Sequence, residues 1–249
     1  MIDKLRAFLQ QTQQNRRLGR KHQKKFQRWL AMHPGGSYAQ FYAEDARRRI
    51  DVGASHTMLG IASVDQEAAR ARARRVLADF ARAGCAPNHV VVDYGCGSLW
   101  IGQAFMEYLD PGNYIGLDVS DVFFAERLAS MQADFVASRR PMVQVISNAV
   151  LRAVRERGPD FILSLAVIHH VPPADLPGFF ARVISLAGPQ TRIEIGHAVG
   201  FRTRWMPPRR WQHGRYAVRA ALAPLGYVAD YRPEHRIMPT TPGFSLVRR

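Results

Sequence analysis

Short apolar runs alternate with longer amphipathic stretches along most of this chain. Unbroken runs of aliphatic residues are typical of strands buried on both faces, and apolar positions three or four residues apart are typical of helices packed against them. We expect strands at 90–93, 114–118, 143–146, 160–166, 192–196, 227–232 and 244–248. The last two are expected to pair antiparallel, and the whole pattern predicts an α/β protein with one doubly wound sheet.

The amphipathic stretches predict the helices that connect these strands. They lie at 37–49, 65–83, 99–109, 122–137, 173–186 and 216–225, after one or two helices within 2–32 that stop at His33-Pro34-Gly35-Gly36. We therefore expect a basic helical extension and lid candidate at 1–60, followed by a sheet domain at 61–249. That domain carries an insertion at about 200–214.

A glycine turn follows the first strand, which ends on Asp93. Gly95 and Gly97 suit a backbone that bends sharply and lets a ligand lie against it. Asp118 ends the next strand 25 residues after Asp93, where a carboxylate can accept hydrogen bonds from a ribose diol. The dinucleotide fingerprint needs a third glycine at position 100, but Trp100 stands there, which argues against a pyrophosphate ligand such as NAD.

The acid followed by Gly-x-Gly resembles the cofactor motif of class I S-adenosylmethionine-dependent methyltransferases. GCGSL at 95–99, with YLDPGNYIGLD at 108–118, is similar to a mostly bacterial group of these enzymes with little assigned chemistry. The resemblance runs from about residue 80 to the end of the sequence. It implies a seven-stranded Rossmann-like sheet and S-adenosylmethionine (SAM) as cofactor, and it says little about the substrate.

The resemblance also implies where the cofactor binds. Asn148 follows the third strand beside the expected adenine position, where its amide can hydrogen-bond ring nitrogens, although the acid usual in the family is missing. The expected cofactor contacts are Asp93, Gly95, Cys96, Gly97, Asp118, Val119, Asn148, Ser164, Leu165 and Ala166.

His169 and His170 follow the fourth strand, whose tip faces the reactive methyl group in small-molecule methyltransferases. A hydroxyl acceptor benefits from a general base with a pKa near 7, which histidine supplies. Adjacent residues in a turn point about 100° apart, so we expect one ring, His169 by preference, to enter the pocket. A structural role for the pair stays open, and with Asp175 and His197 the pair lacks metal-ligand spacing, so no metal is expected.

Charge is concentrated at the two ends of the sequence. The net charge is +15; residues 1–30 and 201–249 carry +8 each, and 31–200 carry −1. Such ends attract anions. We expect the insertion and the lid candidate to hold the acceptor, through Tyr38, Tyr42, His197, Trp205, Arg209, Arg210 and Trp211.

Three functions remain open at this point. The preferred one is methyl transfer to a small anionic acceptor, with a hydroxyl favoured over nitrogen or carbon. An RNA methyltransferase holding phosphates with its basic ends is the second, although the strand-four Asn/Asp-Pro-Pro-aromatic signature of base-amine enzymes is absent. A binding module that keeps the pocket without chemistry is the third.

Few features bear on location or assembly. Two cysteines without paired spacing, no apolar run of roughly 18 residues and no secretory signal favour a cytoplasmic protein with no transmembrane segment. Dimerisation through the N-terminal helices stays open.

Overall fold

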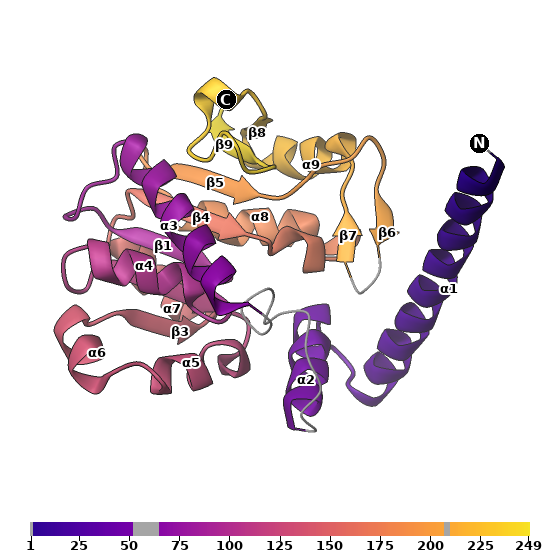
Figure 1. The fold of residues 1–249 in the computed structure, drawn as a ribbon, viewed down its shortest axis with the longest axis horizontal. Coiled ribbons are helices and arrows are strands. Elements are labelled where there is room, and N and C mark those ends of the chain that lie inside the picture. The colour runs from indigo at the N-terminus through magenta and orange to yellow at the C-terminus, as the bar shows by residue number, and fades with distance from the viewer. Residues whose placement is uncertain (1, 52–64, 207–209) are drawn as a thin grey trace.

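A seven-stranded sheet forms the centre of the molecule in this computed structural model, which describes residues 2–51, 65–206 and 210–249 (Figure 1). The strand order is β3-β2-β1-β4-β5-β9-β8; β1 to β5 run parallel, β9 is antiparallel to β5, and β8 is antiparallel to β9. Their bounds are β1 Val91–Tyr94, β2 Tyr114–Asp118, β3 Met142–Val145, β4 Phe161–Leu165, β5 Arg192–Gly196, β8 Tyr227–Asp230 and β9 Phe244–Arg248.

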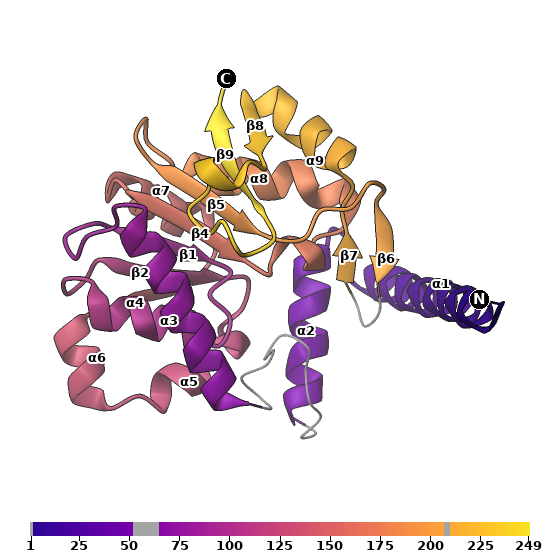
Figure 2. The same ribbon diagram turned by 45° about the horizontal axis from the view of Figure 1, so that its top comes forward.

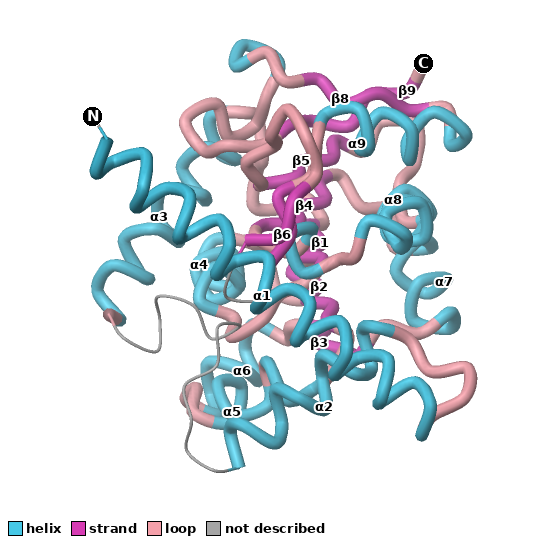
Figure 3. Tube along the Cα trace, turned by 90° about the vertical axis from the view of Figure 1, so that its right-hand side faces the viewer, coloured by secondary structure: helices cyan, strands magenta, loops and turns pink. Residues whose placement is uncertain are grey.

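Helices cover both faces of the sheet. Figure 3 views the sheet near its edge, with α3 and α4 on one side and α7, α8 and α9 on the other. The bounds are α1 Ile2–Met32, α2 Tyr38–Asp51, α3 Gln66–Arg82, α4 Trp100–Tyr108, α5 Ala125–Ala129, α6 Ala133–Arg139, α7 Asn148–Glu156, α8 Leu176–Ser185 and α9 Arg215–Leu222. This architecture confirms the predicted doubly wound, Rossmann-like sheet.

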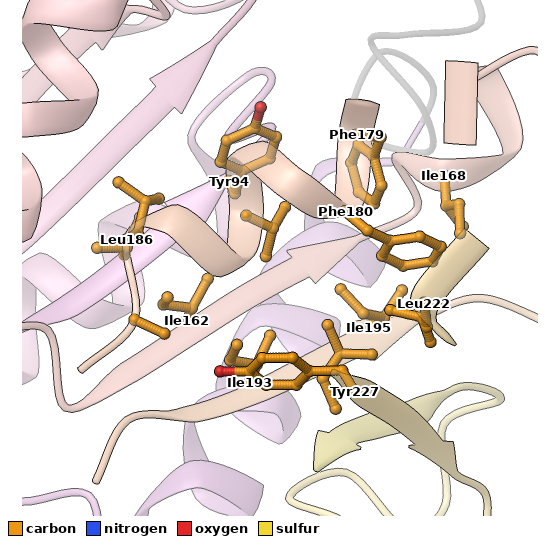
Figure 4. Packing of buried hydrophobic residues seen from close by; sticks show 14 of the residues in the cluster. Tyr94, Ile162, Ile168, Phe179, Phe180, Leu186, Ile193, Ile195, Leu222 and Tyr227 are labelled. Atoms are coloured by element: carbon orange, nitrogen blue, oxygen red, sulfur yellow. The ribbon is translucent and has the colours of Figure 1, made fainter. Parts of the chain in front are cut away.

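The central strands are buried because their apolar residues face helices on both sides. Every residue of β1, β2 and β4 is buried. Figure 4 shows the cluster on the α7–α9 side, where Phe179, Phe180 and Leu222 pack against Ile162, Ile193 and other strand residues. Rigid packing of this kind fixes the positions of the strand tips that carry the candidate site.

Two regions between strands differ from the sequence-based expectation. The helix predicted at 122–137 is broken into a 3₁₀ turn, Asp121–Phe123, then α5 and α6. The Ser130 hydroxyl donates a hydrogen bond of 2.8 Å to the Arg127 carbonyl where α5 ends, a local bond that competes with helix continuation. The helix α7 was not predicted, although Ser147 caps it by accepting from the Val150 N–H at 3.2 Å.

The N-terminal extension contributes α1, one continuous helix, and α2. Figures 1 and 2 show the N-terminal half of α1 projecting away from the sheet while its other half lies near α2 and the hairpin formed by β6 (Arg204–Met206) and β7 (Arg210–Gln212). Trp29, Tyr38, Phe41, Tyr42 and Phe123 form a buried cluster that joins α1 and α2 to the turn after β2. The division into two parts at about residue 60 stays a prediction.

The insertion predicted at 200–214 contains a two-stranded hairpin, β6 Arg204–Met206 and β7 Arg210–Gln212. Its ends meet, because the Gly200 N–H donates to the His213 carbonyl at 2.8 Å and the Arg215 N–H donates to the Gly200 carbonyl at 3.0 Å. The hairpin therefore leaves and rejoins the sheet domain at one place, beside the tip of β5.

Candidate functional site

The turn after β1 is held tightly against the end of β2. The N–H groups of Gly95 and Cys96 donate to the Leu117 carbonyl at 2.6 and 3.0 Å. Gly95 has a φ of +88°, and a Cβ there would lie 2.2 Å from a methyl carbon of Val167, so no other residue fits without displacement. Gly97 has a φ of +51° with no heavy atom within 4 Å of its Cβ position, which leaves open space beside the backbone.

Asp118, at the tip of β2, is fixed by backbone donors. Its Oδ2 accepts from the Gly97 N–H at 2.8 Å, and its Oδ1 accepts from the Val119 N–H at 2.7 Å. Burial raises the pKa of this carboxyl to about 6, and the backbone hydrogen bonds oppose that rise. The carboxylate is thereby oriented at the edge of the glycine turn, with lone pairs left for a further donor.

Asp93 lies deeper, at the tip of β1. Burial raises the pKa of its carboxyl to about 7, and the Tyr114 hydroxyl, which donates to Oδ2 at 3.2 Å, works in the opposite direction. Gly102 on α4 permits this arrangement, because a Cβ there would lie 2.1 Å from the Tyr114 oxygen.

A cavity of about 1500 Å³ extends along the C-terminal tips of β1, β2, β3 and β4. Ligands bind at this edge of open parallel sheets. Of the expected cofactor contacts, those that line the cavity are Asp93, Gly95, Cys96, Gly97, Asp118, Val119, Asn148, Leu165 and Ala166. Ser164 does not line it; the buried hydroxyl donates to the Tyr94 carbonyl at 2.8 Å and ties β4 to β1.

Both candidate histidines line the cavity, and which of the two rings faces an acceptor stays a prediction. They lie in a 3₁₀ turn, Ile168–His170, with ring centroids 4.1 Å apart. Successive residues of a 3₁₀ turn point about 120° apart, yet these two rings lie side by side. His170 Nδ1 shares a hydrogen bond of 2.7 Å with the Tyr42 hydroxyl, which links the turn to α2.

A buried histidine supports this turn from the insertion. His213 Nε2 donates to the Ile168 carbonyl at 2.9 Å, and burial lowers the pKa of His213, which favours the neutral ring. His197, at the tip of β5, does not line the cavity; its ring centroid lies 5.7 Å from that of His169 and 5.9 Å from that of His213. In the described ranges, no group of three or more His, Cys, Asp or Glu is arranged to hold a metal ion.

Only some of the residues expected to bind the acceptor lie at the cavity. Tyr38, Tyr42 and Trp211 line the large cavity, and Trp205 borders an adjoining hollow. Arg209 lies outside the described residues, and Arg210 is described only as backbone of β7.

Two cations that line the cavity were missed by the sequence reasoning. Arg72 comes from α3 and Arg182 from α8, both helices whose positions were predicted. Burial lowers the pKa of Arg72, whereas Arg182 acts to lower the pKa of the Asp175 carboxyl, which burial raises. Each arginine lies one helical turn from an apolar position of its helix. The amphipathic pattern alone does not show whether such an arginine faces a cavity or the solvent, so neither was predicted as a site residue.

Comparison with known proteins shows which solved structures have a similar fold. No family model matches the sequence, and no curated protein matches it. Among solved structures, magnesium protoporphyrin IX methyltransferase from Synechocystis PCC 6803 with bound SAM is similar at a TM-score of 0.54 and 18% identity, over 79% of this chain and 89% of that one. The same enzyme with bound S-adenosylhomocysteine (SAH) gives 0.52 and 16%, over 91% and 95%.

The chain has the class I methyltransferase fold. At these identities the likeness carries the fold alone, and the site has to be judged on its own residues. No helix in the described ranges has the length and apolar composition to cross a lipid bilayer.

Proposed function

We propose that this protein is an enzyme that transfers a methyl group from SAM to a small acceptor. The observation that carries the proposal is the carboxylate of Asp118, oriented by the Gly97 and Val119 N–H groups at the mouth of a large cavity. An acid at this strand tip suits a ribose diol. The fold similarity to an enzyme that binds SAM and SAH supports the same choice of ligand.

The residues around the cavity fit each part of such a cofactor. Val119 and Asn148 flank the expected adenine position, and the open backbone at Gly97 leaves room for the chain beyond the ribose. Arg72, whose exposed side chain lines the cavity, supplies a cation to pair with the carboxylate of the methionine part. Bound there, SAM supplies an electrophilic methyl group.

His169 and His170 are the candidate bases. An in-line displacement needs a nucleophile held near the methyl carbon and, for a hydroxyl, a group that takes its proton. The hydrogen bond from Tyr42 fixes the orientation of the His170 ring. When the hydroxyl donates to Nδ1, the ring proton sits on Nε2, and when Nδ1–H donates to the hydroxyl, Nε2 is the unprotonated ring nitrogen.

The part of α1 that lines the cavity favours a small acceptor over RNA. Its lining residues are His22, Gln23, Phe26 and Gln27, none of them Lys or Arg. Lys25 is paired with buried Asp45 of α2 instead. We propose that the acceptor is small and anionic, with a hydroxyl as the methylated group. RNA binding through many phosphates would weaken steeply with salt, so acceptor affinity that hardly changes with salt supports the small molecule.

Substitution of Asp118 tests the proposed cofactor site. Asp118→Ala is expected to weaken SAH binding by roughly 1.5–3 kcal/mol, the range for hydrogen bonds to a charged group, which is about tenfold to more than a hundredfold in Kd. The measurement is calorimetric titration of SAH. Asp134→Ala, at an exposed position of α6, is the control and should bind like the wild type. Equal SAH affinity in both variants would remove Asp118 from the site.

A further inference from the structure

A second hollow, of about 390 Å³, lies between α1 and the β6–β7 hairpin. Its lining residues are Gly19, Arg20, His22, Gln23, Trp205 and Trp211. His22, Gln23 and Trp211 also line the large cavity, so the two spaces adjoin. Nothing in the proposed cofactor site uses this hollow.

Two unused hydrogen-bond donors distinguish it. The indole Nε1 atoms of Trp205 and Trp211 are both buried, and neither has a hydrogen-bond acceptor among the described residues. Buried polar groups in native structures almost always have partners, and an indole N–H can only donate. A pair of such donors in adjoining rings therefore indicates a ligand that brings oxygen acceptors.

The walls of the hollow are flat and aromatic. The His22 ring stacks on Trp205, with centroids 4.9 Å apart and an interplanar angle of 25°. Trp211 meets Trp205 edge to face at 4.9 Å and 81°. Arg20 adds a cation to the same lining. Aromatic walls favour a planar apolar body, and a guanidinium favours a carboxylate.

The close approach of α1 to the hairpin depends on Gly19. A Cβ at this position would lie 2.9 Å from Cδ1 of Trp205. Glycine in a helix interior is unfavourable relative to alanine, so its presence here is accounted for by the contact with the indole. The hollow is thus bounded by a helix and a hairpin that fit each other closely.

The hollow also lies next to the candidate bases. The strand β7, which carries Trp211, packs against the turn that holds His169 and His170. His213, two residues after Trp211, donates to the Ile168 carbonyl of that turn. A molecule anchored at the indoles can therefore extend toward the histidines through the shared opening.

We propose that this hollow is the acceptor subsite and that it takes a planar aromatic carboxylate. On binding, the two indole rings turn so that their buried N–H groups donate to the carboxylate oxygens, Arg20 pairs with the carboxylate charge, and His22 with the indole rings contacts the aromatic body. The assignment rests on the proposed methyltransferase function, since it names the substrate class of that same site.

The test uses two probes on the full-length protein loaded with SAH. 3-Hydroxy-2-naphthoate has the ring, a hydroxyl and a carboxylate, whereas 2-naphthol lacks the carboxylate; both are titrated calorimetrically. The naphthoate is expected to bind at least roughly tenfold more tightly than the naphthol. Trp205→Phe and Trp211→Phe keep a ring but remove the N–H, so each should lower naphthoate affinity roughly three- to tenfold and leave SAH affinity unchanged.

Tyr216→Phe is the matched control, because it removes one polar atom from an aromatic residue that is 73% exposed on α9. It should bind both probes like the wild type. Equal binding of the two probes, or an unchanged preference in both tryptophan variants, would overturn the proposal. Two further titrations, one of SAH alone and one of the naphthoate without SAH, separate the two claims. Failure of SAH to bind counts against the methyltransferase function. Failure of the naphthoate alone counts against the subsite.

Discussion

Asp93 and Asp118 sit at neighbouring strand tips and differ in their surroundings. Asp118 accepts two backbone hydrogen bonds beside the cavity, whereas Asp93 has the Tyr114 hydroxyl as a partner in a more enclosed position. Both carboxyls have a pKa above the ordinary value of 3.8, because burial disfavours the charged form. Burial therefore favours the neutral, protonated form of both carboxyls more than it does at an exposed aspartate.

Stability should therefore depend on pH in a defined direction. Since the pKa of Asp93 is about 7 in the folded state and 3.8 is the ordinary value, the folded state binds more protons between these limits. The contribution of Asp93 to the free energy of unfolding is fully present below about pH 4 and is lost as the pH rises through 7. The loss is of the order of a few kcal/mol. Asp93→Asn is expected to flatten this decline in urea unfolding measured from pH 4.5 to 8. A decline as steep as in the wild type would assign it to other groups.

The two histidines give a second prediction at this scale. If one of them is the base, its replacement by Ala should lower kcat about 10²–10⁴-fold while SAH affinity is retained. Tyr42→Phe removes the hydrogen bond to His170, so it should shift the pH profile of kcat only if His170 is that base. Methyl transfer at saturating acceptor is the measurement. Full activity of both histidine variants would favour catalysis by proximity alone.

At the scale of elements, the described side chains of α1 contact the rest of the molecule through α2 and the β6–β7 hairpin. Its contacts include Gly19 and His22 against Trp205, Lys25 with Asp45, and Trp29 in the cluster with α2. Contacts made by a helix outside the sheet open locally at a lower free energy than the sheet core does. The helix α1 forms part of the wall of both adjoining cavities.

Gly19→Leu should loosen this attachment without affecting the core. The new side chain has no room beside the Trp205 ring, so tryptic cleavage within α1 should become faster while the thermal midpoint of the sheet domain stays unchanged. Gln14→Leu, at an exposed position of the same helix, should be cleaved like the wild type. Equal cleavage of the two variants would mean that the Gly19 contact does not hold α1 in place.

Sequence patterns predicted some elements well and others not at all, for physical reasons. The strands were predicted because both of their faces carry apolar residues, such as Val91, Val92 and Ile115. The hairpin β6–β7 was missed because its strands span three residues each, too short to show a period, and α7 because only Leu151 and Val154 are buried.

Over the whole molecule, the cofactor side of the cavity was predictable and the acceptor side was not. Asp118 and Gly97 belong to one local strand–turn–helix unit, so their spacing carries the signal. The acceptor side joins α1, α2, α8 and the insertion, which lie far apart in the sequence. The position of Arg182 and the pairing of Tyr42 with His170 are set by tertiary packing alone.

Calorimetric titration of the wild-type protein with SAH and, separately, with NAD tests the central claim most directly. The open backbone at Gly97, the carboxylate of Asp118 and the indole of Trp100 in place of a third glycine predict saturable one-site binding of SAH and no detectable binding of NAD. Tight binding of NAD without any response to SAH would contradict the account.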